Sequence, residues 1–374
     1  VMKTLERVYK NYYFIIRGGL KMKGLVLYER GKTEIREVEK PVCGESDIII
    51  KVESAAICGG DVHFYNGALD LGCYPIVLGH EFAGTIAEMG SKADKYFKVG
   101  DRVVSENTAS VCGRCPACEK GNFVNCPERR TMGCDTDGAF TQYVKVSGDL
   151  LAVYPNALFK LPESIPMEYA PLLEPASNMY MAVVQEGQMM PGENIVVFGA
   201  GAIGLFAVQM AKIAGASNII LVGMPSDQAT RFPCGEKLGA THTIVNDGTI
   251  DLKAEIDKIC GESGVSLCID AAGVPVVLKQ CVEIVRNDGI IVRVGMNDKP
   301  YGYGMNEVNV KSISIVGHMG YNTTSWRNVI NLAACGKLDL KTMVSHKLPL
   351  TEIQKGFDLL KDQTAIKILI DPDK

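Results

Sequence analysis

The chain has 374 residues, of which 47% are hydrophobic, and it carries a formal net charge of -4 at pH 7. Single hydrophobic cores stop growing at roughly 250 to 300 residues, so this length predicts two domains. The slightly acidic balance provides no basic field, and we therefore expect neither nucleic acid nor a membrane as a partner. Clustered cysteines among the thirteen of the chain are typical of metal thiolates in a reducing compartment, so we expect a cytoplasmic protein.

Residues 1–21 form an unusual N-terminal segment, with five basic residues against one acidic residue. Basic, amphipathic segments of this kind are typical of targeting peptides. The stretch from Arg17 to Met22 can also be encoded by a purine-rich ribosome-binding sequence followed by ATG. We favour this second interpretation, in which residues 1–21 are a translated leader or an extension outside the fold.

Short strands separated by Gly, Pro and Asp follow from Met22 to about residue 161, and this pattern predicts a mainly β domain over residues 22–177. Within it, "AAICGGDVHFYNG" and "PIVLGHEFAG" supply a thiolate, an imidazole and a carboxylate, a mixed set suited to a zinc site that keeps one position open. A single cysteine is usually a core residue and a His-Glu pair usually lies on an exposed turn, so only the combination carries the prediction. The candidate residues are Cys58, His80, Glu81 and, in "LLEPA", Glu174.

The stretch "VCGRCPACEKGNFVNC" lies in a loop-rich lobe over about residues 107–132 and has four cysteines at spacings x2, x2 and x7. Four thiolates complete a tetrahedral zinc site and leave no position for a substrate, so we predict a structural zinc. An iron-sulfur cluster is one alternative, and a zinc ribbon that contacts nucleic acid, which the acidic charge disfavours, is another. The predicted ligands are Cys112, Cys115, Cys118 and Cys126.

From residue 178 to residue 318, β-branched runs alternate with helical stretches, which predicts a doubly wound parallel sheet with crossover helices. In "NIVVFGAGAIGLF" a G-x-G-x-x-G pattern joins a strand to a helix, so its backbone is predicted to hold the pyrophosphate of a dinucleotide. The candidate residues are Gly199, Gly201, Ala202, Ile203 and Gly204.

The choice between NAD and NADP is left open by the next strand. Gly223 stands where an acidic residue normally forms a hydrogen bond with the 2'-hydroxyl of the ribose, and Asp227 comes four residues later. Ser226 and Arg231 could instead receive a 2'-phosphate, although Arg231 could equally be an ordinary exposed helix residue. Residues 319–374 end in a helix and a strand and are expected to return to the first domain.

The chain resembles the zinc-dependent medium-chain dehydrogenases in the order and spacing of four motifs, which are "GHEFAGTIAEMG", the four-cysteine lobe, "EPA" and "GAGAIG". The resemblance extends from Met22 to near the C-terminus. Within that group the chain resembles the polyol branch of sorbitol, xylitol and arabinitol-phosphate dehydrogenases, and threonine dehydrogenases share many of these features. The resemblance implies an α/β protein with a GroES-like catalytic domain beside a Rossmann NAD(P)-binding domain. It also implies a homodimer or homotetramer.

The resemblance further implies roles for the site residues. Cys58 and His80 would bind a catalytic zinc, and Glu81 and Glu174 would bind it directly or through its water. The family usually carries Ser or Thr two residues after the first ligand, where its hydroxyl passes on the substrate proton, but this chain has Gly60 there. His63 matches the end of that relay. The proton would therefore leave through ordered water or through a second substrate hydroxyl, which suits a polyol.

The reaction that we expect is interconversion of a secondary alcohol of a polyol or polyol phosphate and the corresponding ketose, with hydride transfer to or from NAD(P) and zinc as a Lewis acid. One catalytic and one structural zinc are expected per chain. The alternatives are oxidation of threonine or another amino alcohol, and a nucleotide-binding protein whose catalysis is impaired by Gly60. Candidate pocket residues are Phe64, Tyr65 and Glu106, and candidate phosphate anchors are Arg129 and Arg130.

Overall fold

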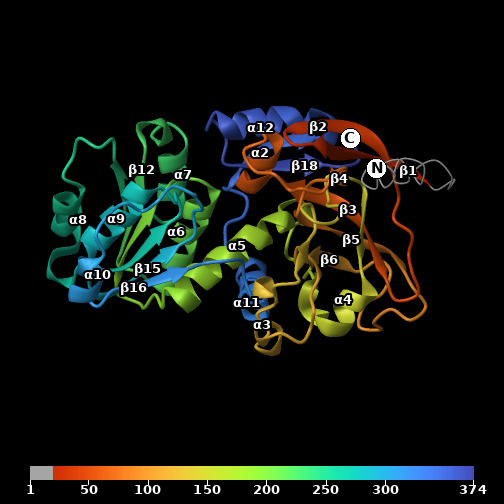
Figure 1. The fold of residues 1–374 in the computed structure, drawn as a ribbon, viewed down its shortest axis with the longest axis horizontal. Helices are drawn as coiled ribbons and strands as arrows, with labels where there is room; N and C mark the ends of the chain where they lie inside the picture. The colour runs from red at the N-terminus through yellow and green to blue at the C-terminus, as the bar shows by residue number, and fades with distance from the viewer. Residues whose placement is uncertain (1–19) are drawn as a thin grey trace, which may run out of the picture.

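The computed structural model describes residues 20–374, which form two domains placed side by side (Figure 1). A mainly β domain is built from the two ends of the chain, and a parallel α/β domain is built from its middle. Helix α5 (Leu173–Tyr180) lies between them and leads through the π-helical turn η4 (Met181–Glu186) into the α/β domain. The predicted fold class is therefore confirmed.

The centre of the β domain is a seven-stranded sheet with the order β10-β6-β5-β3-β18-β17, and β9 pairs with β3. A three-stranded sheet, β2-β1-β4, and the short pair β7-β8 complete it. The strands are β1 (Lys21–Glu29), β2 (Lys32–Glu39), β3 (Ile48–Ala56), β4 (Ile76–Val77), β5 (Glu81–Met89), β6 (Arg102–Ser105), β7 (Thr108–Ser110), β8 (Arg130–Thr131), β9 (Tyr143–Val146), β10 (Leu158–Lys160), β17 (Val344–Pro349) and β18 (Lys367–Asp371).

Strand β18 brings the end of the chain into the middle of this sheet. It pairs antiparallel with β3, with Leu369 opposite Ala56, and parallel with β17. Apolar side chains from both ends of the chain share the core beneath, so neither end can complete the domain alone. The helices of this domain are α2 (Gly59–Tyr65), α3 (Pro116–Glu119), α4 (Gly148–Val153), α11 (Thr323–Ala334) and α12 (Ile353–Lys361).

The N-terminal boundary differs slightly from the predicted one. Strand β1 begins at Lys21, and the carbonyl group of Leu20 accepts the backbone N–H of Lys40 at 2.9 Å. Both residues are therefore part of the sheet, although they fall inside the predicted extension 1–21. The remaining residues of that extension, 1–19, lie outside the described residues.

The α/β domain contains one six-stranded parallel sheet with the order β13-β12-β11-β14-β15-β16. The order reverses beside β11, and the crevice at the carboxyl end of such a switch point is where ligands bind in doubly wound folds. Its strands are β11 (Asn194–Phe198), β12 (Asn218–Gly223), β13 (His242–Val245), β14 (Val265–Asp270), β15 (Val285–Arg293) and β16 (Ser314–Gly317), and its helices are α6 (Ala202–Ala214), α7 (Arg231–Leu238), α8 (Leu252–Cys260), α9 (Pro275–Ile284) and α10 (Asn306–Val310).

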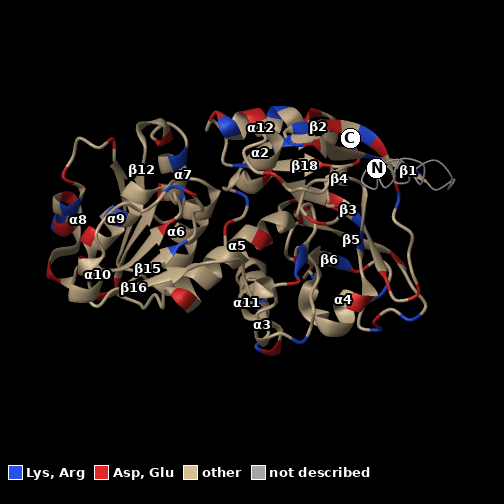
Figure 2. Cartoon of the chain, viewed as in Figure 1, with Lys and Arg blue, Asp and Glu red and all other residues tan. Residues whose placement is uncertain are grey.

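Basic and acidic residues are interspersed over both domains in the view of Figure 2. Among the helices of residues 20–374, none is long and apolar enough to cross a membrane.

Candidate functional site

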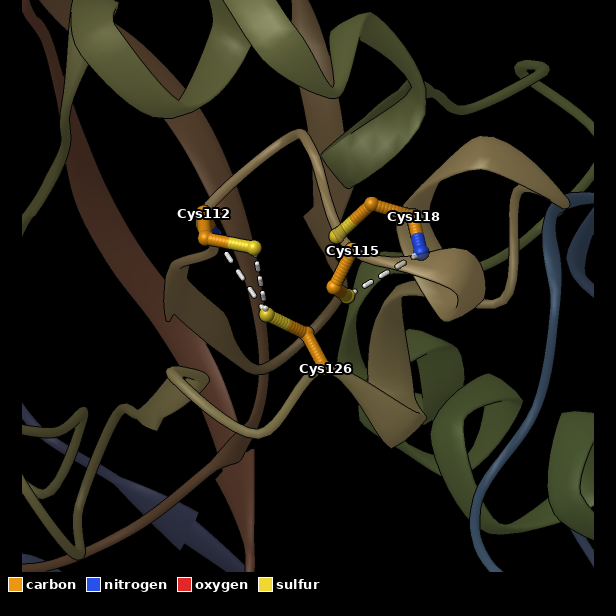
Figure 3. Close-up of side chains that lie close together, drawn as sticks. All are labelled: Cys112, Cys115, Cys118 and Cys126. Carbon is orange, nitrogen blue, oxygen red and sulfur yellow. Dashed lines mark hydrogen bonds between the residues drawn. The ribbon is translucent and has the colours of Figure 1, made fainter.

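The four cysteines of the predicted structural site converge on one point of the loop between β7 and β8. Their sulfur atoms all lie within 4.8 Å of one another and turn toward a common centre (Figure 3). Cys115 caps the N-terminus of the short helix α3, and its sulfur accepts the backbone N–H of Cys118 at 3.5 Å. The backbone N–H of Cys112 lies 3.3 Å from the sulfur of Cys126. Loop and helix therefore hold four thiol groups together, which is the set of donors that a tetrahedral zinc site requires.

The electrostatics of this cluster also fit a bound cation. Hydrogen bonds from backbone N–H groups, chiefly that of Arg114, lower the pKa of Cys112 to about 7, whereas burial raises the pKa of Cys118 to about 12. Four thiolates this close repel one another unless a metal ion neutralises them. A divalent zinc ion would supply that charge and would keep the lobe closed.

A second donor set forms where β3 and β5 meet. The two strands are antiparallel neighbours in which Ala56 pairs with Glu81, so the residues that follow β3 lie beside those that begin β5. One donor atom each from Cys58, His80 and Glu81 lies within 4.8 Å of the other two. A thiolate, an imidazole and a carboxylate suit a zinc site with an open position. Cys58 also caps helix α2 and thereby fixes its own sulfur, which accepts the backbone N–H of Gly60 at 3.5 Å.

Asp61 and Lys367 hold this donor set in place, and the sequence patterns indicated neither. Nδ1 of His80 lies 3.3 Å from Oδ1 of the fully buried Asp61, which leaves Nε2 for a metal ion. The ammonium group of Lys367 contacts both carboxylate oxygens of Glu81 and donates to the carbonyl group of Ile57 at 3.0 Å. Lys367 and Glu81 are separated by 286 residues, and only the insertion of β18 beside β3 brings them together.

Glu174 lies beside the donor set but does not belong to the group of three donors within 4.8 Å. It is buried in the first turn of α5, and its Oε1 atom accepts an N–H of the Asn107 side chain at 3.1 Å. Burial, and after it the negative charge of Glu81, raise the pKa of Glu174 to about 7. A carboxyl group in this position could bind a metal ion directly or through its water.

The other two residues of the predicted proton path lie on helix α2. Gly60 occupies open space, since a Cβ atom built on it would meet only the sulfur of Cys58, at 3.8 Å. His63 is exposed in the last turn of the same helix. Gly60 thus lies beside the donor set and His63 lies at the surface, but Gly60 has no side chain that could pass a proton toward His63.

The glycine-rich turn after β11 has the geometry that a dinucleotide requires. Gly199 has a φ of +100°, and a Cβ atom on Gly204 would lie 1.8 Å from the Gly199 carbonyl oxygen, so neither position readily accepts another residue. A Cβ atom on Gly201 would meet nothing within 4 Å, which leaves room for a phosphate. Ala202 and Ile203 open helix α6, whose N-terminal N–H groups face that space.

The residues predicted to select the cofactor have protein partners. The hydroxyl group of Ser226 donates to the side chain of Gln363 at 3.0 Å, and Arg231 pairs with Asp227 at 3.1 Å. The Asp227 carboxylate folds back toward the end of β12, where a Cβ atom on Gly223 would lie 2.7 Å from its Oδ2 atom. Asp227 therefore restores an acidic group to the place where the sequence shows only Gly223.

Three further candidate residues have partners within the protein. Tyr65 stacks on Phe357 of α12 with 4.6 Å between ring centroids. Glu106 is fully buried and accepts both the N–H and the hydroxyl of Thr108. Arg129 is occupied as well, because its guanidinium group donates to the side chains of Thr108 and Asn107. The guanidinium group of Arg129 is therefore directed into the protein and not toward solvent.

Comparisons with known proteins agree with this geometry. The family model of the alcohol dehydrogenase GroES-like domain matches residues 44–156, and that of the zinc-binding dehydrogenases matches residues 202–334. An uncharacterized zinc-type alcohol dehydrogenase-like protein of Escherichia coli is 42% identical over 94% of this chain and 99% of its own length. The chain therefore belongs to the zinc-dependent alcohol dehydrogenase family, and it is an NAD(P)-dependent enzyme.

Relatives with named substrates fall into two groups. The D-arabitol-phosphate dehydrogenase of Enterococcus avium is 31% identical over 94% of this chain and 97% of its own. The L-threonine 3-dehydrogenase of Bacillus velezensis is 34% identical over 95% of this chain and 100% of its own. Among solved structures, an alcohol dehydrogenase from Escherichia coli CFT073 in complex with NADH superimposes with a TM-score of 0.84, at 28% identity over 94% of this chain and 100% of its own.

The first prediction concerns the metal content. Purified enzyme is expected to contain two zinc ions per chain, and Cys118→Ser is expected to contain one, because three thiolates bind zinc more weakly than four. The variant should also unfold at a lower temperature, since the loop between β7 and β8 loses its cross-link. Elemental analysis and thermal denaturation measure both effects. Two zinc ions per chain in Cys118→Ser would contradict a metal site that requires all four cysteines.

The second prediction concerns the cofactor. Replacing Asp227 with Ser removes a negative charge from the end of β12 and releases Arg231, so the ratio of kcat/KM for NAD to that for NADP should fall about tenfold or more. The control is Asp247→Ser, an exposed position after β13. An unchanged ratio in Asp227→Ser would mean that this carboxylate does not face the adenosine ribose.

Proposed function

We propose that this enzyme interconverts a secondary alcohol of a polyol or polyol phosphate and the corresponding ketose, with hydride transfer to or from NAD(P). The observation that carries the choice of a polyol is the open space at Gly60, beside the sulfur of Cys58. When bound, zinc polarises the substrate oxygen and the nicotinamide ring exchanges the hydride.

The residues of the chain hold and orient the reacting groups. Cys58 and His80 would hold the metal ion. Oδ1 of Asp61 lies 3.3 Å from Nδ1 of His80, beside the ring nitrogen that would not bind the metal, and so helps to position the ring. The ion pair between Glu81 and Lys367 holds the Glu81 carboxyl group in place although both side chains are out of water. Glu174 supplies a second carboxylate on the side of α5.

The substrate hydroxyl must also lose a proton, and the structure supports a substrate that helps to remove it. Gly60 offers no hydroxyl group beside the metal donors, while the exposed His63 lies further along the same helix. A vicinal hydroxyl group of a polyol fits the open space at Gly60 and can pass the proton toward His63 or solvent. A monohydric alcohol lacks that group.

The relatives support the same substrate class and one alternative. D-arabitol-phosphate dehydrogenase is similar over nearly the whole chain, and so are sorbitol dehydrogenases. L-threonine 3-dehydrogenases are similar to the same extent, so oxidation of an amino alcohol is the second candidate. Threonine carries a carboxylate and an ammonium group, and both would need charged partners in the pocket.

The proposed assembly is a homodimer or homotetramer. Strand β16 is the last strand of the parallel sheet and has a neighbour on one side only. Val310, at the end of α10 and four residues before this strand, is 81% exposed, and Met319, two residues after the strand, is 52% exposed. A free strand edge beside exposed apolar side chains is suited to pairing with a second copy of the chain.

The substrate class is tested by a screen of sorbitol, xylitol, arabinitol, their phosphates and threonine, each with NAD and with NADP. At least one polyol or polyol phosphate should be oxidised with a kcat/KM about tenfold or more above that of threonine, because a matched hydroxyl array aligns the reacting carbon. Turnover of threonine alone would replace the proposal by its alternative. Absence of turnover with any alcohol in zinc-loaded enzyme would favour a nucleotide-binding protein.

The role of the second hydroxyl is tested with 2,3-butanediol and 2-butanol in Gly60→Ser. A hydroxyl group that relays the proton is expected to raise the rate of oxidation roughly tenfold or more. Gly60→Ser should therefore accelerate oxidation of 2-butanol at least tenfold, while oxidation of the diol changes less than threefold. Gly59→Ser is the matched control, because Gly59 is exposed and a Cβ atom on it would meet nothing within 4 Å, whereas one on Gly60 would meet the sulfur of Cys58 at 3.8 Å. Equal effects of Gly60→Ser on both alcohols would contradict a relay through the substrate.

A further inference from the structure

Arg129 is placed in an unusual way for an arginine of a surface lobe. It follows Cys126 by three residues, and its backbone N–H donates to the Cys126 carbonyl oxygen at 3.0 Å. Its side chain is only 16% exposed and turns inward. There Nε donates to the hydroxyl of Thr108 at 2.8 Å and Nη2 donates to Oδ1 of Asn107. The neighbouring Arg130 is exposed and contacts a backbone carbonyl of its own loop at 3.2 Å.

The contact with Arg129 fixes the side-chain amide of Asn107. A guanidinium group has only donors, so it selects the oxygen end of the amide. The nitrogen end must then point the other way, where Nδ2 donates to Oε1 of Glu174 at 3.1 Å. The backbone N–H of Asn107 donates to the hydroxyl of Tyr321 at 3.2 Å, so the main chain is held as well. Asn107 is buried and can exchange these partners only at a high cost.

The charge of Arg129 is balanced locally and not by Glu174. The fully buried carboxylate of Glu106 has an oxygen 3.7 Å from Nη2 of Arg129. The same carboxylate accepts the backbone N–H of Thr108 at 3.1 Å and its hydroxyl at 2.8 Å. Arg129 therefore acts on Glu174 through the orientation of Asn107 and not through direct attraction.

We propose that Arg129 and Asn107 are positioning residues for Glu174, and that they couple the four-cysteine lobe to the catalytic metal centre. The inference rests on the proposed function, in which Glu174 is one of the carboxylates of that centre. Zinc held by Cys126 fixes the start of the segment that carries Arg129, Arg129 orients Asn107, and Asn107 orients the carboxylate. The structural metal thereby contributes to the geometry of a catalytic site whose donors lie on other elements.

The test compares Asn107→Leu, Arg129→Met and the control Arg130→Met in enzyme whose catalytic zinc has been exchanged for Co²⁺. Asn107→Leu keeps the side-chain volume and leaves the pair of Arg129 and Glu106 intact, so it remains informative if Arg129→Met fails to fold. The visible absorption spectrum of the bound Co²⁺ reports the carboxylate geometry. The rate of Co²⁺ loss to a chelator is the second measurement, and neither depends on knowing the substrate.

Asn107→Leu and Arg129→Met are expected to shift the Co²⁺ spectrum and to release Co²⁺ about 10 to 100-fold faster, as replacements of residues that orient metal ligands do. On the alcohol that the unmodified enzyme oxidises best, kcat should fall about tenfold while the KM for the nicotinamide cofactor changes less than twofold. The double variant should be no worse than the poorer single one, because both act on the same carboxylate. Arg130→Met should match the unmodified enzyme in both Co²⁺ measurements, the spectrum and the rate of Co²⁺ release.

Two outcomes would overturn the inference. An Asn107→Leu enzyme with an unchanged spectrum, unchanged Co²⁺ release and kcat within twofold would show that Asn107 only stabilises the fold. Equal effects of Arg130→Met and Arg129→Met would show a general loss of lobe structure. Neither outcome bears on the substrate class, so failure here is distinguishable from failure of the proposed function.

Discussion

The structure around the candidate metal centre depends on the pairing of charges that the fold removes from water. Glu81 and Lys367 are buried together, and the buried Glu106 lies 3.7 Å from Arg129, whose side chain is mostly out of water. A charged group left alone at such a depth costs several kcal/mol, so each pair has to form completely or not at all. Complete pairing holds the carboxylates near the donor set in one arrangement, which is what a site for a small, oriented substrate requires.

These pairs also explain why the β domain is assembled from distant parts of the chain. Strand β18 delivers Lys367 to Glu81 from the C-terminal end, and helix α5 delivers Glu174 from the start of the connection to the parallel sheet. The glycine turn after β11 lies on the other domain (Figure 1). The metal donors and the nucleotide turn therefore come from different domains, and α5 and η4 connect the two within one shared apolar cluster.

Much of the site could be predicted from the sequence because its parts are contiguous motifs. The x2, x2, x7 spacing of the lobe and the G-x-G-x-x-G turn each place several functional residues within one loop, where local geometry decides the outcome. The roles of Lys367, Asn107 and Arg129 could not be predicted, because they depend on strand register and on contacts between remote segments. The position of Asp227 could be predicted only in part. Its separation of four residues from Gly223 was visible in the sequence, but the 3-10 turn that directs its carboxylate back toward Gly223 was not.

The most direct test of the account is zinc-edge anomalous diffraction from crystals of the enzyme grown with NAD or NADP. The account predicts two peaks per chain, one within the four cysteines and one bonded to Cys58 and His80, with the reactive carbon of the nicotinamide ring within about 4 Å of the space for substrate at the second peak. A single peak at the cysteine lobe, or a nicotinamide ring directed away from Cys58 and His80, would contradict it.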